Sequence, residues 1–172
     1  MIKLVIFDFD DTITDNRYLD YASFKTTFNK FNIKNELSLK KLISLRQKCY
    51  TAKNILKVVQ NSTEKKFSSK NFLNDRKNFL LSYESNNYLK VKKDTTYLME
   101  YLDSKNISIL LCSVRHDKNI IKKFLKENNI EDYFKNIFCS SDLKLTIEND
   151  TSSNRILIKS SLLKKILIKN KI

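Results

Sequence analysis

A short apolar run at the start of the chain ends abruptly in a cluster of aspartates. Residues 3–7 read Lys-Leu-Val-Ile-Phe, and Asp8, Asp10, Asp11 and Asp15 follow at once. The run has the length and composition of a β-strand. Like charges at a strand end repel one another, so the cluster indicates a bound cation. Side chains alternate in an extended segment, so Asp8 and Asp10 point the same way and can share a hard cation such as Mg²⁺.

This stretch resembles the first signature of the haloacid dehalogenase superfamily, a strand followed by Asp-x-Asp-x-Thr. Asp8, Asp10 and Thr12 match that signature residue for residue. The resemblance implies that Asp8 is a nucleophile, that Asp10 is a general acid and base, and that both bind Mg²⁺. It also implies that Thr12 steadies the loop beside the phosphate. The residues alone leave open a surface cluster in which Asp15 caps the next helix.

Length and charge set the broad class of protein. A chain of 172 residues can form one domain, or one domain that carries a smaller insert. Its net charge of +14 would suit a nucleic-acid partner. The lysines are spread along the chain, however, and no basic block with interleaved aromatic residues is present. We therefore favour compositional drift over nucleic-acid binding, in a chain that has no glycine and no proline.

The three cysteines are odd in number and lack the spacing of metal ligands. This usage is typical of reduced thiols in the cytoplasm. No secretory signal is visible at the N-terminus, and no apolar segment reaches the length of a membrane span. We expect a cytoplasmic protein without a membrane partner.

Residues 16–89 have a helical pattern throughout. Tyr21, Phe24, Phe28 and Phe31 recur at spacings of three and four, and polar clusters separate this helix from those that follow. The pattern predicts an all-helical insert between two parts of a core, residues 1–15 and 90–172. The family resemblance implies that such an insert is a cap that closes over the active site and reads the substrate.

After the insert, the pattern returns to alternating helices and strands. Asp94 is the expected N-cap of a helix, and residues 107–113 and 136–139 are the expected strands that follow. Strands joined through helices predict a parallel sheet, so the fold class is α/β with a Rossmann-like core and the helical cap inserted after the first strand. Ser113 and Asp8 should then lie at the carboxyl ends of neighbouring strands, where such sheets bind ligands.

The resemblance extends to this second strand. Ser113 matches the second family signature, whose hydroxyl binds the transferring phosphoryl group. Arg115 and His116 follow as candidates for substrate contact, although each also suits a solvated loop position.

The last predicted helix, residues 156–169, is basic and amphipathic. The third family signature is a lysine near the start of such a helix, and Lys159 is the best-placed candidate for phosphate binding. Lys123 is the alternative, but it lies earlier in the chain than the signature implies. Lys144 is a third choice.

The fourth family signature is a strand that ends in acidic residues and completes the metal site. It should follow the helix of Lys159, but the sequence reaches Ile172 first, and Glu148 and Asp150 precede that helix. Three explanations stay open: a truncated gene or fragment, a partner chain that completes the sheet, or a shortened variant with little activity. Without the last strands, the first strand of an isolated domain would lie near an exposed sheet edge.

The resemblance as a whole implies an enzyme. We expect a Mg²⁺-dependent phosphohydrolase that acts on a small phosphorylated metabolite through an aspartyl-phosphate on Asp8. The alternative is a catalytically inactive or truncated relative that binds an acidic partner or nucleic acid.

Overall fold

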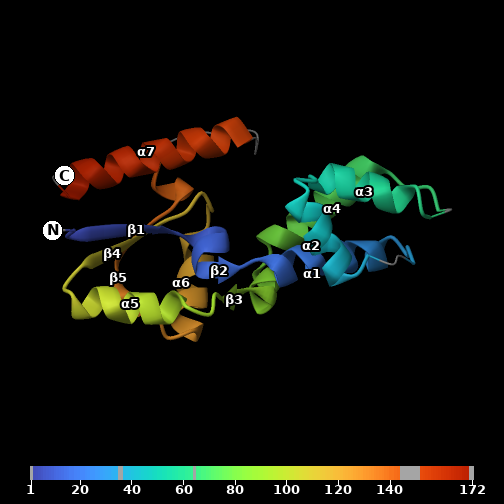
Figure 1. Ribbon diagram of the computed structural model, residues 1–172. Coiled ribbons are helices and arrows are strands. Elements are labelled where there is room, and N and C mark those ends of the chain that lie inside the picture. The colour runs from blue at the N-terminus through green and yellow to red at the C-terminus, as the bar shows by residue number, and fades with distance from the viewer. Residues whose placement is uncertain (1, 35–36, 64, 144–151, 171–172) are drawn as a thin grey trace. The chain divides into compact units, whose positions relative to one another are not determined.

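The computed structural model describes residues 2–34, 37–63, 65–143 and 152–170 (Figure 1). The chain divides into two compact units. Unit 1 combines Met1–Asp15 with Val91–Ile172, and unit 2 is Asn16–Lys90. The chain therefore leaves unit 1 directly after the aspartate cluster. Two short strands, β2 (Thr14–Asp15) and β3 (Lys90–Val91), pair with each other where it leaves and returns.

Unit 1 is built on a parallel sheet with the strand order β1-β4-β5. These strands are β1 (Leu4–Asp8), β4 (Ser108–Cys112) and β5 (Phe134–Phe138). The pairing of β1 with β4 runs in register from Leu4 opposite Ser108 to Asp8 opposite Cys112. The predicted α/β class with a parallel sheet is confirmed, and β5 begins slightly earlier than the sequence pattern suggested.

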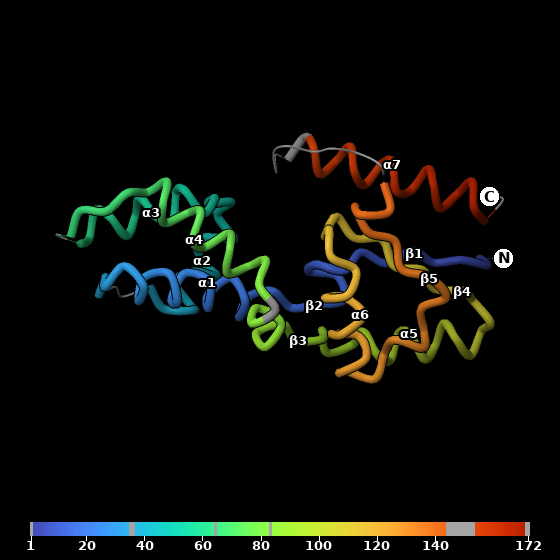
Figure 2. Tube along the Cα trace, turned by 180° about the vertical axis from the view of Figure 1, so that it is seen from behind, coloured from blue at the N-terminus to red at the C-terminus, as the bar shows by residue number. Residues whose placement is uncertain are grey.

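Helices lie on both faces of this sheet (Figures 1 and 2). On one face, α7 (Ser152–Asn170) contributes to an apolar cluster with β4 and β5, whose buried members are Leu110, Cys112, Phe138, Ile158, Leu162 and Ile166. The other face carries α5 (Thr95–Ser104) and α6 (Lys118–Glu127). Within the described residues no strand pairs with the second edge of β1, whose side chains are all half-buried.

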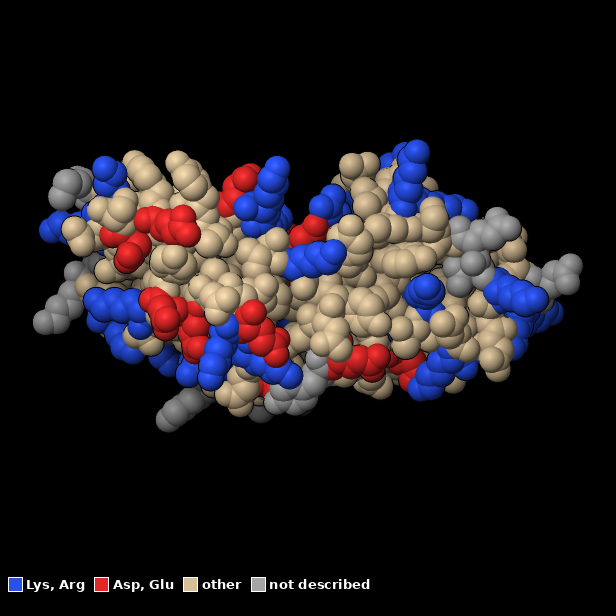
Figure 3. All heavy atoms as spheres, turned by 90° about the horizontal axis from the view of Figure 1, so that it is seen from below, with Lys and Arg blue, Asp and Glu red and all other residues tan. Residues whose placement is uncertain are grey.

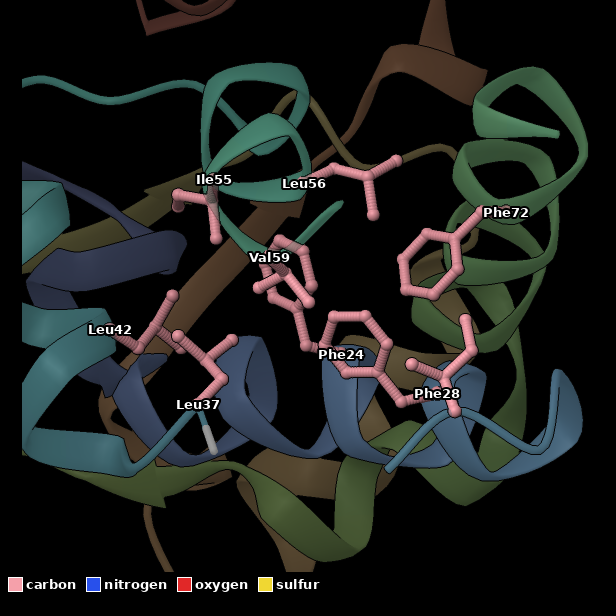
Figure 4. Packing of buried hydrophobic residues seen from close by; sticks show 9 residues of the cluster. Phe24, Phe28, Leu37, Leu42, Ile55, Leu56, Val59 and Phe72 are labelled. Carbon is pink, nitrogen blue, oxygen red and sulfur yellow. The ribbon is translucent and has the colours of Figure 1, made fainter. Parts of the chain in front are cut away.

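Unit 2 is helical and has its own core. Its helices are α1 (Arg17–Lys30), α2 (Leu39–Gln47), α3 (Ala52–Gln60) and α4 (Ser69–Leu81). Phe24 and Phe28 from α1 meet Phe72 from α4 (Figure 4). The ring centres of Phe28 and Phe72 lie 4.8 Å apart. The aromatic residues whose spacing predicted this insert thus form part of its hydrophobic core.

Serine and threonine cap three of these helices. Ser38, Thr51 and Ser68 have extended backbones, and each side chain accepts a hydrogen bond from the third residue along. Asp94 takes the N-cap position of α5, as the sequence predicted, but its side chain makes no cap hydrogen bond. The alternative in which Asp15 caps α1 is wrong. Asp15 lies in β2, and Asn16 takes the N-cap position of α1.

Asparagine closes several helices in this glycine-free chain. Asn32, Asn106 and Asn129 have φ angles of 50°, 52° and 55°, two residues beyond the ends of α1, α5 and α6. The residue after each asparagine donates back to a carbonyl in the last helical turn, as in a Schellman motif. Asparagine tolerates this left-handed conformation better than other non-glycine residues, which explains how the helices end without glycine.

A charged cluster is partly buried among the helices of unit 2. Asp20 on α1 accepts hydrogen bonds from Arg46 on α2 at 2.7 and 2.9 Å, and it also pairs with Arg76 on α4. The Arg76 guanidinium lies 4.5 Å from the centre of the Phe24 ring. Burial lowers the pKa of Arg76 despite the Asp20 charge. One carboxylate therefore joins three helices.

Surface charge is distributed rather than gathered on the face that Figure 3 shows. Lys and Arg side chains lie there in separate groups, with Asp and Glu between them.

None of the described helices is long and apolar enough to cross a membrane.

Candidate active site

The carboxyl ends of β1 and β4 bring together two of the predicted site residues. Asp8 is the last residue of β1, and its neighbour across the sheet is Cys112, which directly precedes Ser113. Ser113 continues the sheet by donating its N–H to the carbonyl of Phe138 at 2.8 Å. Open α/β sheets bind ligands at this end of their strands.

An irregular turn, Phe9–Ile13, carries the chain away from Asp8. The Phe9 N–H donates to Oδ1 of Asp8 at 2.9 Å, and Asp11 adopts a left-handed φ of 57°. Lys92 donates to the Asp11 carbonyl through its ammonium group. The hydrogen bond between Phe9 and Asp8 therefore holds the turn from within, and Lys92, which directly follows β3, holds it from outside.

The hydroxyl that steadies this turn belongs to Thr14. Thr14 is fully buried, and its Oγ1 donates to the Phe9 carbonyl at 3.1 Å. Thr12 is exposed, and its side chain makes no hydrogen bond within the described residues. The sequence pattern alone does not reveal the burial that gives Thr14 this place. The expected role of Thr12 in the loop beside the phosphate stays a prediction.

Lys159 reaches Asp8 from α7. Its Nζ lies 2.5 Å from Oδ1 of Asp8, and both side chains are about one-third exposed, at 31% and 36%. The neighbouring Ile158 is buried against the sheet, which orients this part of α7. Within the described part of the chain, Oδ2 of Asp8 has no hydrogen-bond or ion-pair partner.

The other candidate lysines lie elsewhere. Lys123 is on α6, where its Nζ is 3.7 Å from the carboxylate of Glu127 one turn away. Lys144 falls outside the described residues, as do Glu148 and Asp150. Of the lysines weighed from the sequence, the described structure brings Lys159 to Asp8.

Arg115 pairs with the second aspartate of the signature. Its Nε donates to both carboxylate oxygens of Asp10 at 3.1 Å, and its Nη2 donates to Oδ1 at 2.8 Å. Each signature aspartate therefore has its own cation, Lys159 for Asp8 and Arg115 for Asp10.

Ser113 is less accessible than expected, whereas His116 is exposed. Ser113 is fully buried, and its Oγ accepts the N–H of Arg115 at 3.1 Å. The Nδ1 of His116 lies 3.5 Å from Oγ of Ser140, in the segment after β5. His116 thus contacts a neighbouring loop, while the Ser113 hydroxyl supports the turn that carries Arg115.

An ion pair beside this loop joins α6 to the segment after β5. The Lys118 Nζ lies 2.7 Å from Oδ1 of Asp142, whose Oδ2 accepts the Cys139 N–H at 2.8 Å. Burial opposes ionisation of Asp142. The hydrogen bonds from Lys118 and Cys139, with the charges of Lys118 and Lys165, outweigh that effect and lower its pKa.

The described residues offer few ligands for a metal ion. No group of three or more His, Cys, Asp or Glu side chains converges among them. The carboxylate of Asp8 and the main-chain oxygen of Asp10 are the donors that the signature supplies. Mg²⁺ commonly binds through one or two carboxylates, with water and substrate phosphate completing its shell. This small set of oxygens fits an ion held in that way.

Comparison with known protein families matches most of the chain. A family model for haloacid dehalogenase-like hydrolases matches residues 5–161. No curated protein gives a significant match to the sequence.

Solved structures share the fold at low sequence identity. A candidate phosphatase from Clostridium difficile superposes with a TM-score of 0.68 and 18% identity, over 99% of this chain and 71% of its own. A haloacid dehalogenase-superfamily hydrolase from Geobacter sulfurreducens gives 0.67 and 15%, over 99% and 73%. A candidate phosphoglycolate phosphatase from Haemophilus somnus gives 0.58 and 15%, over 86% and 67%. At these identities the likeness establishes the fold.

Proposed function

Because this chain belongs to the haloacid dehalogenase-like hydrolase family, we propose that it hydrolyses a small phosphate monoester through a covalent intermediate on Asp8. One observation carries the proposal. The Asp8 carboxylate lies at the carboxyl end of β1, with Oδ1 held by Lys159 and the Phe9 N–H and Oδ2 without a partner among the described residues. A carboxylate fixed through one oxygen can attack with the other.

The first step is attack on phosphorus. Oδ2 of Asp8 forms the new P–O bond, and the ester oxygen leaves with a proton from Asp10, as a general acid provides. Lys159 lies beside the attacked centre and offsets the negative charge of the transferring group. Lys159 also keeps Asp8 oriented between turnovers.

The second step releases phosphate. Asp10, now ionised, removes a proton from water, and the resulting hydroxide attacks phosphorus of the aspartyl-phosphate. The P–O bond to Asp8 breaks, which regenerates its carboxylate. Asp10 regains the proton that the next leaving group needs.

Mg²⁺ is the proposed cofactor. The Asp8 carboxylate and the main-chain oxygen of Asp10 would hold it, and when bound it supplies positive charge beside the phosphoryl oxygens. The helical unit 2 is the proposed substrate-selecting cap, since it is inserted directly after the turn that carries Asp10. A small phosphorylated metabolite is the proposed substrate class.

Oxygen exchange tests the covalent intermediate without knowledge of the substrate. Inorganic phosphate is incubated with the protein and Mg²⁺ in ¹⁸O-labelled water. Reversible formation of the aspartyl-phosphate on Asp8 should place ¹⁸O in the phosphate, and Asp8→Asn should place none there. Equal exchange by the parent and the variant would contradict a role for Asp8 as nucleophile.

A further inference from the structure

The guanidinium of Arg115 engages Asp10 through two of its nitrogen atoms. We propose that Arg115 is the residue that positions the Asp10 carboxylate for proton transfer, and that its remaining N–H groups bind the phosphoryl group of the substrate. This inference rests on the proposed function, because it assigns a role in the same reaction.

The main chain of Arg115 is fixed by the segments that follow two strands. Its N–H donates to Oγ of Ser113, directly after β4, at 3.1 Å. Its carbonyl accepts from both the N–H and Oγ of Ser140, after β5, at 3.1 and 3.2 Å. Three hydrogen bonds therefore fix the main chain from which the Arg115 side chain extends. An arginine in a solvated loop would need none of these bonds.

The side chain is also supported along its length. The Arg115 guanidinium carbon lies 5.2 Å from the centre of the Phe9 ring, within the range of a cation–π contact. Phe9 is fully buried and meets Phe124 of α6 edge-on, with ring centres 5.5 Å apart. The Arg115 side chain is only 19% exposed, so the guanidinium rests on a rigid aromatic surface.

This arrangement holds both Asp10 oxygens at once. A guanidinium is a planar fork that can bond a carboxylate through two nitrogens, whereas a lysine ammonium acts as a point charge. The double contact restrains rotation of the Asp10 carboxylate, which is what a group that delivers a proton to one particular oxygen requires.

The guanidinium retains donors for a second anion. It carries five N–H groups, and within the described residues its side chain bonds no acceptor other than Asp10. When Asp10 is ionised, Arg115 also offsets its charge. Lys159 offsets that of Asp8, so an incoming phosphate dianion does not meet an unpaired Asp8 carboxylate.

Kinetics test the positioning role. With an aryl phosphate, Arg115→Met should lower kcat about a hundredfold, the scale of a general acid–base contribution, and should raise KM. Added methylguanidinium should restore part of kcat, and Arg115→Lys should restore KM more than kcat. Arg155→Met, which removes an exposed arginine on α7, is the matched control. An active parent whose kcat survives Arg115→Met would overturn the inference and leave the proposed function standing.

A spectroscopic measurement tests the same inference in protein of any activity. The ¹⁵N-edited signal of the Arg115 Nε–H, assigned through Arg115→Lys, should move in Asp10→Asn. It should also move in the parent when inorganic phosphate is added. A signal that responds to neither change would overturn the inference. A signal that responds to both, in protein that hydrolyses no ester, would support it and count against the proposed function.

Discussion

The Nζ atom of Lys159 lies 2.5 Å from Oδ1 of Asp8, which joins the last helix of unit 1 to its first strand. Lys159→Met should remove the cation beside the phosphoryl group and lower kcat/KM for an aryl phosphate about ten- to a hundredfold, the scale of one hydrogen bond to a charged group. Steady-state kinetics measure this loss. Lys123→Met removes a lysine that instead pairs with Glu127, so it should leave kcat/KM unchanged. Equal losses in both variants would contradict the assignment of Lys159.

Unit 2 should depend on Asp20. Asp20→Asn leaves two arginines partly buried without their shared carboxylate, and the Arg76 side chain is only 11% exposed. We expect the free energy of unfolding to fall by about 3 kcal/mol, as when one partner is removed from a buried ion pair. Urea unfolding followed by circular dichroism measures the change.

Asp75 provides the matched control for Asp20. It pairs with Lys30 at 2.9 Å, but Lys30 is 65% exposed. Asp75→Asn should therefore cost less than about 1 kcal/mol, the usual limit for a surface ion pair. Similar decreases in the free energy of unfolding in the two variants would show that the Asp20 cluster stabilises the protein no more than a surface ion pair does.

The stability of unit 1 should vary with pH through Asp142. Its pKa is lowered in the folded protein, since the bonds from Lys118 and Cys139 and the nearby positive charges outweigh burial. A carboxyl whose pKa is lowered on folding contributes its full stabilisation at pH values above its unfolded-state pKa, 3.8. That contribution is lost as the pH falls through the lower pKa of the folded state.

The corresponding measurement compares Asp142→Asn with the parent. The variant should unfold more easily near neutral pH, and the difference in unfolding free energy should shrink below about pH 4. Asp103→Asn, at an exposed position on α5, is the control and should show no such pH-dependent difference. A gap between Asp142→Asn and the parent that stays constant down to low pH would contradict the assignment.

The three thiols should react at very different rates. Cys49 is exposed, whereas Cys112 and Cys139 are buried. Burial raises the pKa of Cys112, and it raises that of Cys139 to about 12. Thiolate is the reactive form, so iodoacetamide should label Cys49 in the folded protein and the other two only after unfolding. Mass spectrometry of the labelled peptides reads this out, and rapid native labelling of Cys139 would contradict its placement.

Much of the fold follows from patterns in the sequence. The apolar runs predicted the strands β1, β4 and β5, because residues buried in a parallel sheet are apolar in succession. The aromatic period of α1 predicted its buried face. The Asp20 cluster was not foreseen, because a charged residue in a helical pattern reads as solvated until its partners on other helices are known.

The candidate site was predictable where a local signature exists. Asp8 and Asp10 came from one short stretch, and the helix carrying Lys159 was expected from its amphipathic pattern. The pairing of Arg115 with Asp10 could not be predicted, because it depends on how the loops after β4 and β5 fold against each other. Thr14 was missed because its role depends on burial, which the signature does not encode.

Phosphate release from a panel of small phosphate esters tests the central claim most directly. The parent, Asp8→Asn and Asp11→Asn are compared with Mg²⁺ and after its removal by a chelator. Asp11→Asn is the matched control, since asparagine suits the left-handed backbone there. The account predicts metal-dependent release by the parent and Asp11→Asn, and none by Asp8→Asn. Release at the parental rate by Asp8→Asn, or no release by folded parent protein across the panel, would contradict it.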